Sequence, residues 1–113
     1  MDSFTKQYLI TALWAETDGQ EPLDSNYELT DISEETVNQA QKDCEEFRKK
    51  AGTLTDGIEE SQVAHDFWLT RNGHGAGFWD RGYENQIGEK LTSIAKEFKE
   101  ISLYVGDDGK IYS

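Results

Sequence analysis

Cysteine, proline and long apolar runs are nearly absent from this sequence, which holds one cysteine, one proline and 35% hydrophobic residues. A single cysteine cannot form an internal disulfide, so a secreted domain held together by disulfides is excluded. No run approaches the roughly 18 apolar residues of a membrane-spanning helix, and the N-terminus lacks the basic and apolar segments of a signal peptide. We therefore expect one cytoplasmic domain over residues 1–113, without a membrane partner.

Basic residues are also scarce, since 11 lysines and arginines stand against 23 aspartates and glutamates, for a net charge of −12. The excess is local: residues 15–62 carry 14 acids and 4 bases, whereas residues 63–113 carry 8 acids and 6 bases. Direct binding to nucleic acid needs a basic face that neutralises phosphates, so it is disfavoured. An acidic face instead attracts a protein with a basic surface and speeds their encounter.

Helical periodicity is the main pattern that the sequence does contain. The segment 34–51 is the clearest example, because Ser33 can cap its start and Gly52 can end it. In the first helix, Ile10 and Trp14 widen the apolar stripe, which predicts that this helix is well buried. Apolar residues recur at the three/four spacing of a helix in four segments: residues 3–17, 34–51, 58–72 and 86–99.

An alternative stays open for the third of these segments. Residues 67–71 and 76–80 could pair as a β-hairpin across Asn72-Gly73. The helix is favoured, because its apolar pattern begins well before Phe67.

The remaining segments complete the fold class. Residues 19–32 are rich in turn formers and predict a loop. Apolar and polar residues alternate from Ile101, and Asp107-Asp108-Gly109 supplies a turn before the chain returns through Tyr112, which predicts a β-hairpin. We therefore expect an α+β fold, in which three to four helices pack with a short C-terminal antiparallel β-hairpin.

The segment 65–83 concentrates both histidines among arginines, aspartates and aromatic rings. No zinc-ligand spacing, nucleophile elbow or phosphate-binding lysine motif accompanies them, so we expect no metal and no cofactor and assign no catalytic residue. Cys44 lies on the apolar stripe of its helix, where a thiol without a basic neighbour stays protonated. One interpretation remains a small hydrolase-like enzyme, with a pocket built from His65, Asp66, Arg71, His74 and Asp80.

The same segment also supports two non-enzymatic interpretations. Tryptophan and arginine are favoured anchors at interfaces, so a recognition surface could include Arg71, His74, Trp79 and Arg81. Alternatively, the two arginines pair with Asp66 and Asp80, stack on the rings and hold the segment in shape.

The acidic residues upstream form a second candidate surface. An array of carboxylates can imitate the phosphates of nucleic acid and occupy a basic groove of a partner protein. The alternative is a solvated face without a partner. The array would comprise Glu34, Glu35, Asp43, Glu45 and Glu46, preceded along the chain by Asp24, Glu28 and Asp31.

The block HDFWLTRNGHGAGFWDRG, residues 65–82, resembles one found in an uncharacterised family of small acidic proteins encoded by bacteriophages and prophages. Flanking pieces resemble that family too, including Ala12-Leu13-Trp14, Glu21-Pro22-Leu23-Asp24 and residues 103–112. The family carries no established activity, so the resemblance assigns no role to any residue. It implies expression in the cytoplasm of an infected bacterium.

The leading hypothesis is a phage-encoded binding protein, present as a monomer or small homo-oligomer. Its acidic face would meet a host protein with a basic surface, and so inhibit or modulate a protein of nucleic-acid handling or defence. The small enzyme, and a structural or interaction protein without an inhibitory role, are the alternatives.

Overall fold

The longest element, helix α2 (Glu34–Ala51), spans the residues that the sequence predicts for it. The Ser33 side chain caps the helix by accepting a hydrogen bond from the Thr36 backbone N–H. Acids occupy the first turn and bases the last, as the helix dipole favours. Gly52 ends the helix at a φ of 51°, which a residue with a side chain adopts rarely.

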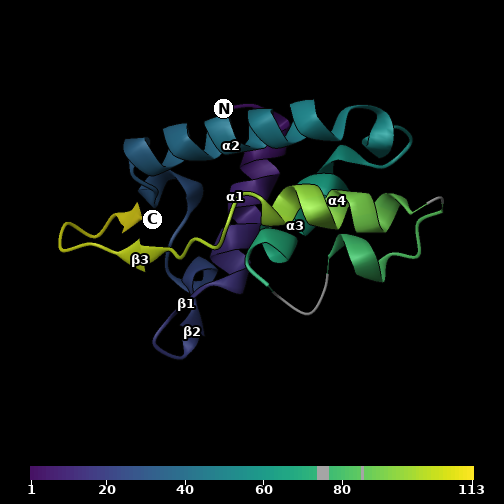
Figure 1. Ribbon diagram of the computed structural model, residues 1–113. Helices are drawn as coiled ribbons and strands as arrows, with labels where there is room; N and C mark the ends of the chain where they lie inside the picture. The colour runs from purple at the N-terminus through teal and green to yellow at the C-terminus, as the bar shows by residue number, and fades with distance from the viewer. Residues whose placement is uncertain (74–76, 85) are drawn as a thin grey trace.

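The computed structural model describes residues 1–73, 77–84 and 86–113, so His74 and Ala76 lie outside the described residues. Within these ranges the fold is α+β, and its layout is elongated, with extents of 46 × 26 × 22 Å (Figure 1). The other α-helices are α1 (Ser3–Ala15), α3 (Glu60–Arg71) and α4 (Ile87–Lys96). The strands are β1 (Thr17–Asp18), β2 (Glu21–Pro22), β3 (Tyr104–Val105) and β4 (Ile111–Tyr112). Short 3-10 helices are η1 (Leu23–Ser25), η2 (Leu29–Asp31), η3 (Gly52–Thr55) and η4 (Phe78–Asp80).

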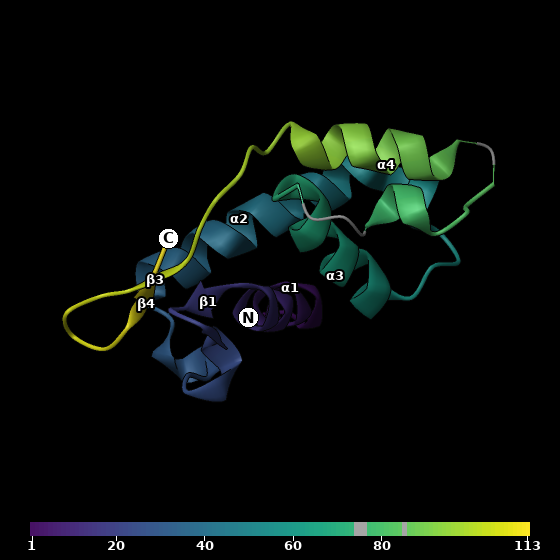
Figure 2. The ribbon, with the colours of Figure 1, turned by 90° about the horizontal axis from the view of Figure 1, so that it is seen from below.

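Helix α3 lies at the centre of the molecule, packed between α1 and α4 (Figure 2). Residues 67–71 belong to this α-helix and not to the alternative hairpin, and all its residues from Asp66 to Arg71 are buried. Its Phe67 stacks on Phe47 of α2, with ring centroids 4.2 Å apart, and contacts Tyr8 of α1 at 5.2 Å. This aromatic cluster is the core of the fold.

Helix α1 is less buried than its apolar stripe predicts. Ile10 is 41% exposed and Trp14 is 55% exposed, so the expectation of burial is wrong for these two side chains. Helix α1 packs against α2, α3, η1 and η2, and seven of its residues are buried, but these contacts do not cover Ile10 and cover Trp14 only in part. The chain then leaves the helix at Glu16 in an extended conformation.

Residues 17–22 form a small antiparallel hairpin, β1–β2, at the start of the predicted loop. Gly19 makes its turn with a φ of 70°. The rest of the predicted loop consists of η1 and η2, and the Leu23 side chain is buried against α1.

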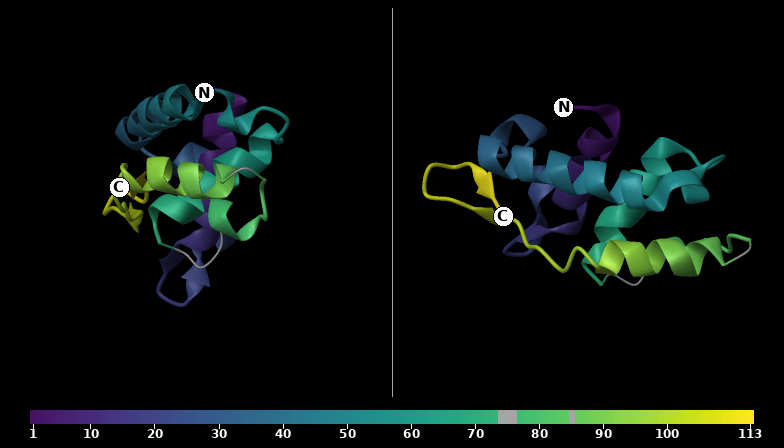
Figure 3. Two further views of the ribbon diagram at one scale, coloured as in Figure 1. Left: turned by 45° about the vertical axis from the view of Figure 1, so that its right-hand side comes forward. Right: turned by 45° about the horizontal axis from the view of Figure 1, so that its top comes forward.

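The predicted C-terminal hairpin is confirmed as β3–β4, with Tyr104 opposite Tyr112. Its strands are shorter than predicted, because regular pairing begins at Tyr104 and not at Ile101. The buried Ile111 fixes it to the start of α2: its carbonyl accepts a hydrogen bond from the Ser33 N–H at 2.8 Å. The hairpin therefore lies beside the N-terminal end of α2, and α4 lies at the other end of the molecule (Figures 1 and 3). No helix in the described ranges is long and apolar enough to cross a membrane.

Candidate functional site

Arg71, at the end of α3, makes more side-chain hydrogen bonds than any other described residue of the 65–83 segment. Its Nη1 donates to the Tyr8 hydroxyl and to the Asp43 carboxylate, both at 2.9 Å. Its Nε and Nη2 donate to the backbone carbonyls of Lys99 and Phe98 at 2.9 and 2.6 Å. One guanidinium thus ties α3 to α1, α2 and the end of α4.

These contacts correct two sequence-based expectations. Arg71 is 4% exposed, so it cannot form part of a recognition surface, and its carboxylate partner is Asp43, not Asp66 or Asp80. The Asp43 side chain is only 16% exposed and is used in this pair, so it does not belong to an exposed acidic array. Burial also raises the pKa of the Tyr8 hydroxyl, which remains a neutral donor and acceptor within the network.

Arg81, the second arginine of the segment, makes the predicted pair with Asp66. The Nε and Nη2 atoms of Arg81 donate to the two oxygens of the Asp66 carboxylate at 2.9 and 3.0 Å. The pair is asymmetric, because the Asp66 side chain is 1% exposed and that of Arg81 is 39% exposed. Hydrogen bonding to Asp66 raises the pKa of the Arg81 guanidinium. Both Trp79 and Asp80 are exposed, so Trp79 and Arg81 remain available at the surface.

His65 is half-buried on the side of α3 that faces α1. Its Nδ1 lies 2.9 Å from the Thr11 hydroxyl, and its ring lies beside Trp14, with centroids 5.6 Å apart. His65 and Arg81 both line a shallow depression of about 250 Å³. Of the residues proposed for a catalytic pocket, Asp66 bonds to Arg81 and Arg71 bonds to Asp43, so these two side chains are engaged with different partners.

The described ranges contain neither a cluster of metal-ligating side chains nor a reactive thiol. No group of three or more His, Cys, Asp or Glu side chains converges there to hold a metal ion. Cys44 is buried, as its place on the apolar stripe of α2 predicts, and burial raises the pKa of its thiol to about 12. A thiol with this pKa is protonated at neutral pH and is a poor nucleophile.

Negative charge collects at one end of the molecule. Residues 16–35 contain eight acids and no base, and they form the β1–β2 hairpin, η1, η2 and the start of α2. The β3–β4 hairpin adds two acids and Lys110. We call residues 16–35 and 104–113 the acidic end; it lies where the C-terminal hairpin meets the start of α2 (Figure 2). Its acids are all exposed or half-buried: Glu16, Asp18, Glu21, Asp24, Glu28, Asp31, Glu34, Glu35, Asp107 and Asp108.

The predicted array along α2 is interrupted. Glu34 and Glu35 lie in the acidic end, but Glu45 and Glu46 lie about three turns further along the helix. Lys42 and Lys49 flank that second pair in the sequence, and Lys50 lies 3.7 Å from the Glu46 carboxylate. The acids of residues 16–35 therefore come mainly from the segment before α2, and only the first turn of the helix contributes Glu34 and Glu35.

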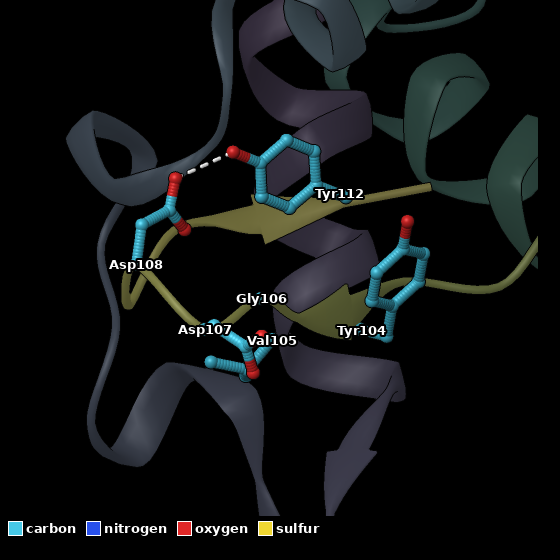
Figure 4. Close-up of a pocket in the computed structure, with 6 residues that line it drawn as sticks. All are labelled: Tyr104, Val105, Gly106, Asp107, Asp108 and Tyr112. Carbon is cyan, nitrogen blue, oxygen red and sulfur yellow. Dashed lines mark hydrogen bonds between the residues drawn. The ribbon is translucent and has the colours of Figure 1, made fainter.

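A pocket on the C-terminal hairpin was not foreseen from the sequence. It has a volume of about 510 Å³ and is lined by residues 104–108 and Tyr112 (Figure 4). The signal was present in the predicted hairpin, because strand pairing places directly opposite residues on the same face. The sequence pattern predicted a strand that begins at Ile101, and it did not predict that Tyr104 pairs with Tyr112.

Comparison with known proteins adds no relative: no protein-family model, curated protein or solved structure matches the chain.

Proposed function

We propose that this protein is a phage-encoded binding protein whose acidic end docks onto a basic surface of a host protein. The observation that carries the proposal is the run of 20 residues, 16–35, with eight acids and no base. The resemblance of residues 65–82 to small phage and prophage proteins supplies the setting of an infected bacterial cell.

The placement of these acids supports binding better than it supports stability. Within the described ranges, none of the ion pairs of the protein uses an acid of the acidic end. Crowded like charges repel one another in the folded state. A basic partner would relieve this repulsion, and the field of the acidic end would speed the encounter.

Nucleic-acid-binding surfaces are the basic surfaces that such a field fits best. They are built to neutralise a row of phosphates, so a protein that offers carboxylates in their place competes for the same lysines and arginines. The consequence for the host protein is loss of access to nucleic acid. A protein of nucleic-acid handling or of defence is therefore the partner that we propose.

The test is affinity capture from bacteria that express the protein, with two variants of equal net charge. The first, Asp18→Lys/Asp24→Lys/Glu35→Lys, reverses exposed acids of the acidic end. The matched control, Glu45→Lys/Glu84→Lys/Glu89→Lys, reverses exposed acids elsewhere, and each variant reverses one acid in the first turn of a helix.

We expect the first variant to lose a partner that the control retains. Capture should also weaken as salt approaches about 1 M, where the Debye length is about 3 Å, and added duplex DNA should displace the partner. Equal loss in both variants would show that net charge alone acts. A capture that neither salt nor DNA changes would contradict the proposal.

A further inference from the structure

The pocket on the C-terminal hairpin is bounded by two tyrosine rings. Tyr104 and Tyr112 are directly paired across the strands, so they project on the same side, and their rings are stacked at 5.9 Å with an angle of 24° between them. The neighbouring pair, Val105 and Ile111, projects to the opposite side, where Ile111 is fully buried. The tyrosines consequently face solvent, and Tyr104 is 57% exposed.

The Tyr112 ring is held in place from two directions. Its hydroxyl donates to the Asp108 carboxylate at 2.5 Å (Figure 4). Below the ring lies Gly106, where an added Cβ would come within 2.6 Å of a ring carbon, so only glycine leaves room for this position of the ring. The wall of the pocket is therefore formed before any ligand arrives, which lowers the ordering cost of binding.

The turn of the hairpin adds negative charge beside the rings. Asp107 and Asp108 both line the pocket, and none of the described residues that line it is basic. The hydrogen bond from Tyr112 lowers the pKa of the Asp108 carboxyl, so this group is ionised at neutral pH. Aromatic faces next to carboxylates attract a cation, because the ring quadrupole and the anion act in the same direction.

We propose that this pocket receives one arginine side chain of the basic partner; the inference rests on the proposed function and names the contact that it makes. Arginine fits better than lysine, because its planar guanidinium can stack on the open face of Tyr104 while its N–H groups bond to Asp107. A cavity of about 510 Å³ is ample for one such side chain.

The test uses a peptide of sequence Gly-Gly-Arg-Gly-Gly, acetylated and amidated so that arginine supplies its only charge. Amide resonances of the protein are followed by NMR during titration. Peptides with citrulline, an uncharged analogue of arginine, and with lysine are the controls. We expect the arginine peptide to shift the amide resonances of residues 104–112. The lysine peptide should bind several-fold more weakly, and the citrulline peptide should cause no shifts.

Three variants separate the roles of ring and charge. Tyr104→Leu keeps apolar bulk without an aromatic face, and Asp107→Asn removes one charge; each should weaken arginine binding about fivefold or more. Tyr104→Phe should retain it. Three results would overturn the proposal that the pocket binds arginine. These are equal binding of the citrulline and arginine peptides, undiminished arginine binding by Tyr104→Leu, and resonance shifts confined to residues 16–35.

The two proposals can fail separately. If the arginine peptide does not bind here while the salt-sensitive capture persists, the pocket is wrong and the docking function stands. If the peptide binds as expected but no partner responds to charge reversal at the acidic end, the docking function is wrong and the pocket stands.

Discussion

The 65–83 segment and the acidic end use charge in opposite ways. In the segment, each arginine is bonded to a carboxylate that is largely or fully removed from solvent, Asp43 for Arg71 and Asp66 for Arg81. In the acidic end, ten acids share one base and lie at the surface. A high density of charged residues in a sequence therefore does not by itself indicate a site.

Burial explains the contrast. Transfer of a charge out of water costs several kcal/mol, so a buried carboxylate persists only with a partner and further hydrogen bonds. Arg71 and Arg81 provide these bonds; the guanidinium of Arg71 is used within the fold, whereas that of Arg81 is partly exposed. Exposed carboxylates keep their hydration and remain free to meet a partner, which is why we place function at the acidic end.

The largest expected effect comes from removal of the Arg71 guanidinium. Arg71→Met keeps much of the side-chain volume but leaves Asp43, the Tyr8 hydroxyl and two carbonyls without their donor. Loss of one partner of a buried pair costs about 3–5 kcal/mol. Urea unfolding followed by circular dichroism should show a loss of this size in the free energy of unfolding.

Arg48→Met is the matched control for this substitution. Arg48 also pairs with a carboxylate, that of Glu60 at 3.3 Å, but both side chains are nearly half exposed. Exposed pairs contribute about 1 kcal/mol or less, so the control should remain close to the unsubstituted protein. A cost for Arg71→Met as small as that of Arg48→Met would mean that the buried network is dispensable.

The sequence predicts what depends on neighbours along the chain. Helix α2 is confirmed with its Ser33 cap because all its signals are local. The Arg81–Asp66 pair, 15 residues apart, was foreseen within one segment, whereas the Arg71–Asp43 pair joins helices 28 residues apart. That pairing depends on how α2 packs against the end of α3, and no local pattern encodes it.

Exposure was the harder property to predict. Trp14 is a large apolar residue at a position where periodicity indicates burial, and it is more than half exposed. Tyr104 is also more than half exposed, and it alternates in the sequence with Leu103 and Val105. Which side of α1 is covered depends on the other helices, and a two-stranded hairpin has only one side against the core. The sequence therefore indicated the elements of the candidate pocket but not its open face.

A smaller loss of stability than that of Arg71→Met is expected from Gly88→Ala, at the contact between η4 and α4. A Cβ added at Gly88 would lie 2.8 Å from the Phe78 carbonyl oxygen, so Gly88→Ala should push η4 away from the helix. The better helix propensity of alanine, about 1 kcal/mol, offsets part of the strain. We expect a net loss of about 1–3 kcal/mol in urea unfolding.

Ser93→Ala, on the exposed side of the same helix, is the control for Gly88→Ala. It should change the free energy of unfolding by less than about 0.5 kcal/mol. A stabilised Gly88→Ala protein would show that η4 adjusts without cost, and that the contact is looser than the Phe78 position indicates.

The smallest effect on stability should come from the acidic end. Asp18→Asn, Asp24→Asn and Glu35→Gln remove exposed charges that have no cation beside them in the described structure, so each should change the free energy of unfolding by less than about 0.5 kcal/mol. Combined, they should stabilise the protein slightly at low salt, because the remaining acids repel one another less, and this gain should fade as salt screens the repulsion. Asp66→Asn is the counterpart in the core and should cost about 2 kcal/mol, since it weakens a buried charge-assisted bond to Arg81. A destabilised triple variant would mean that the acidic end is held together by its carboxylates, and the separation between charge that builds the fold and charge that meets a partner would no longer hold.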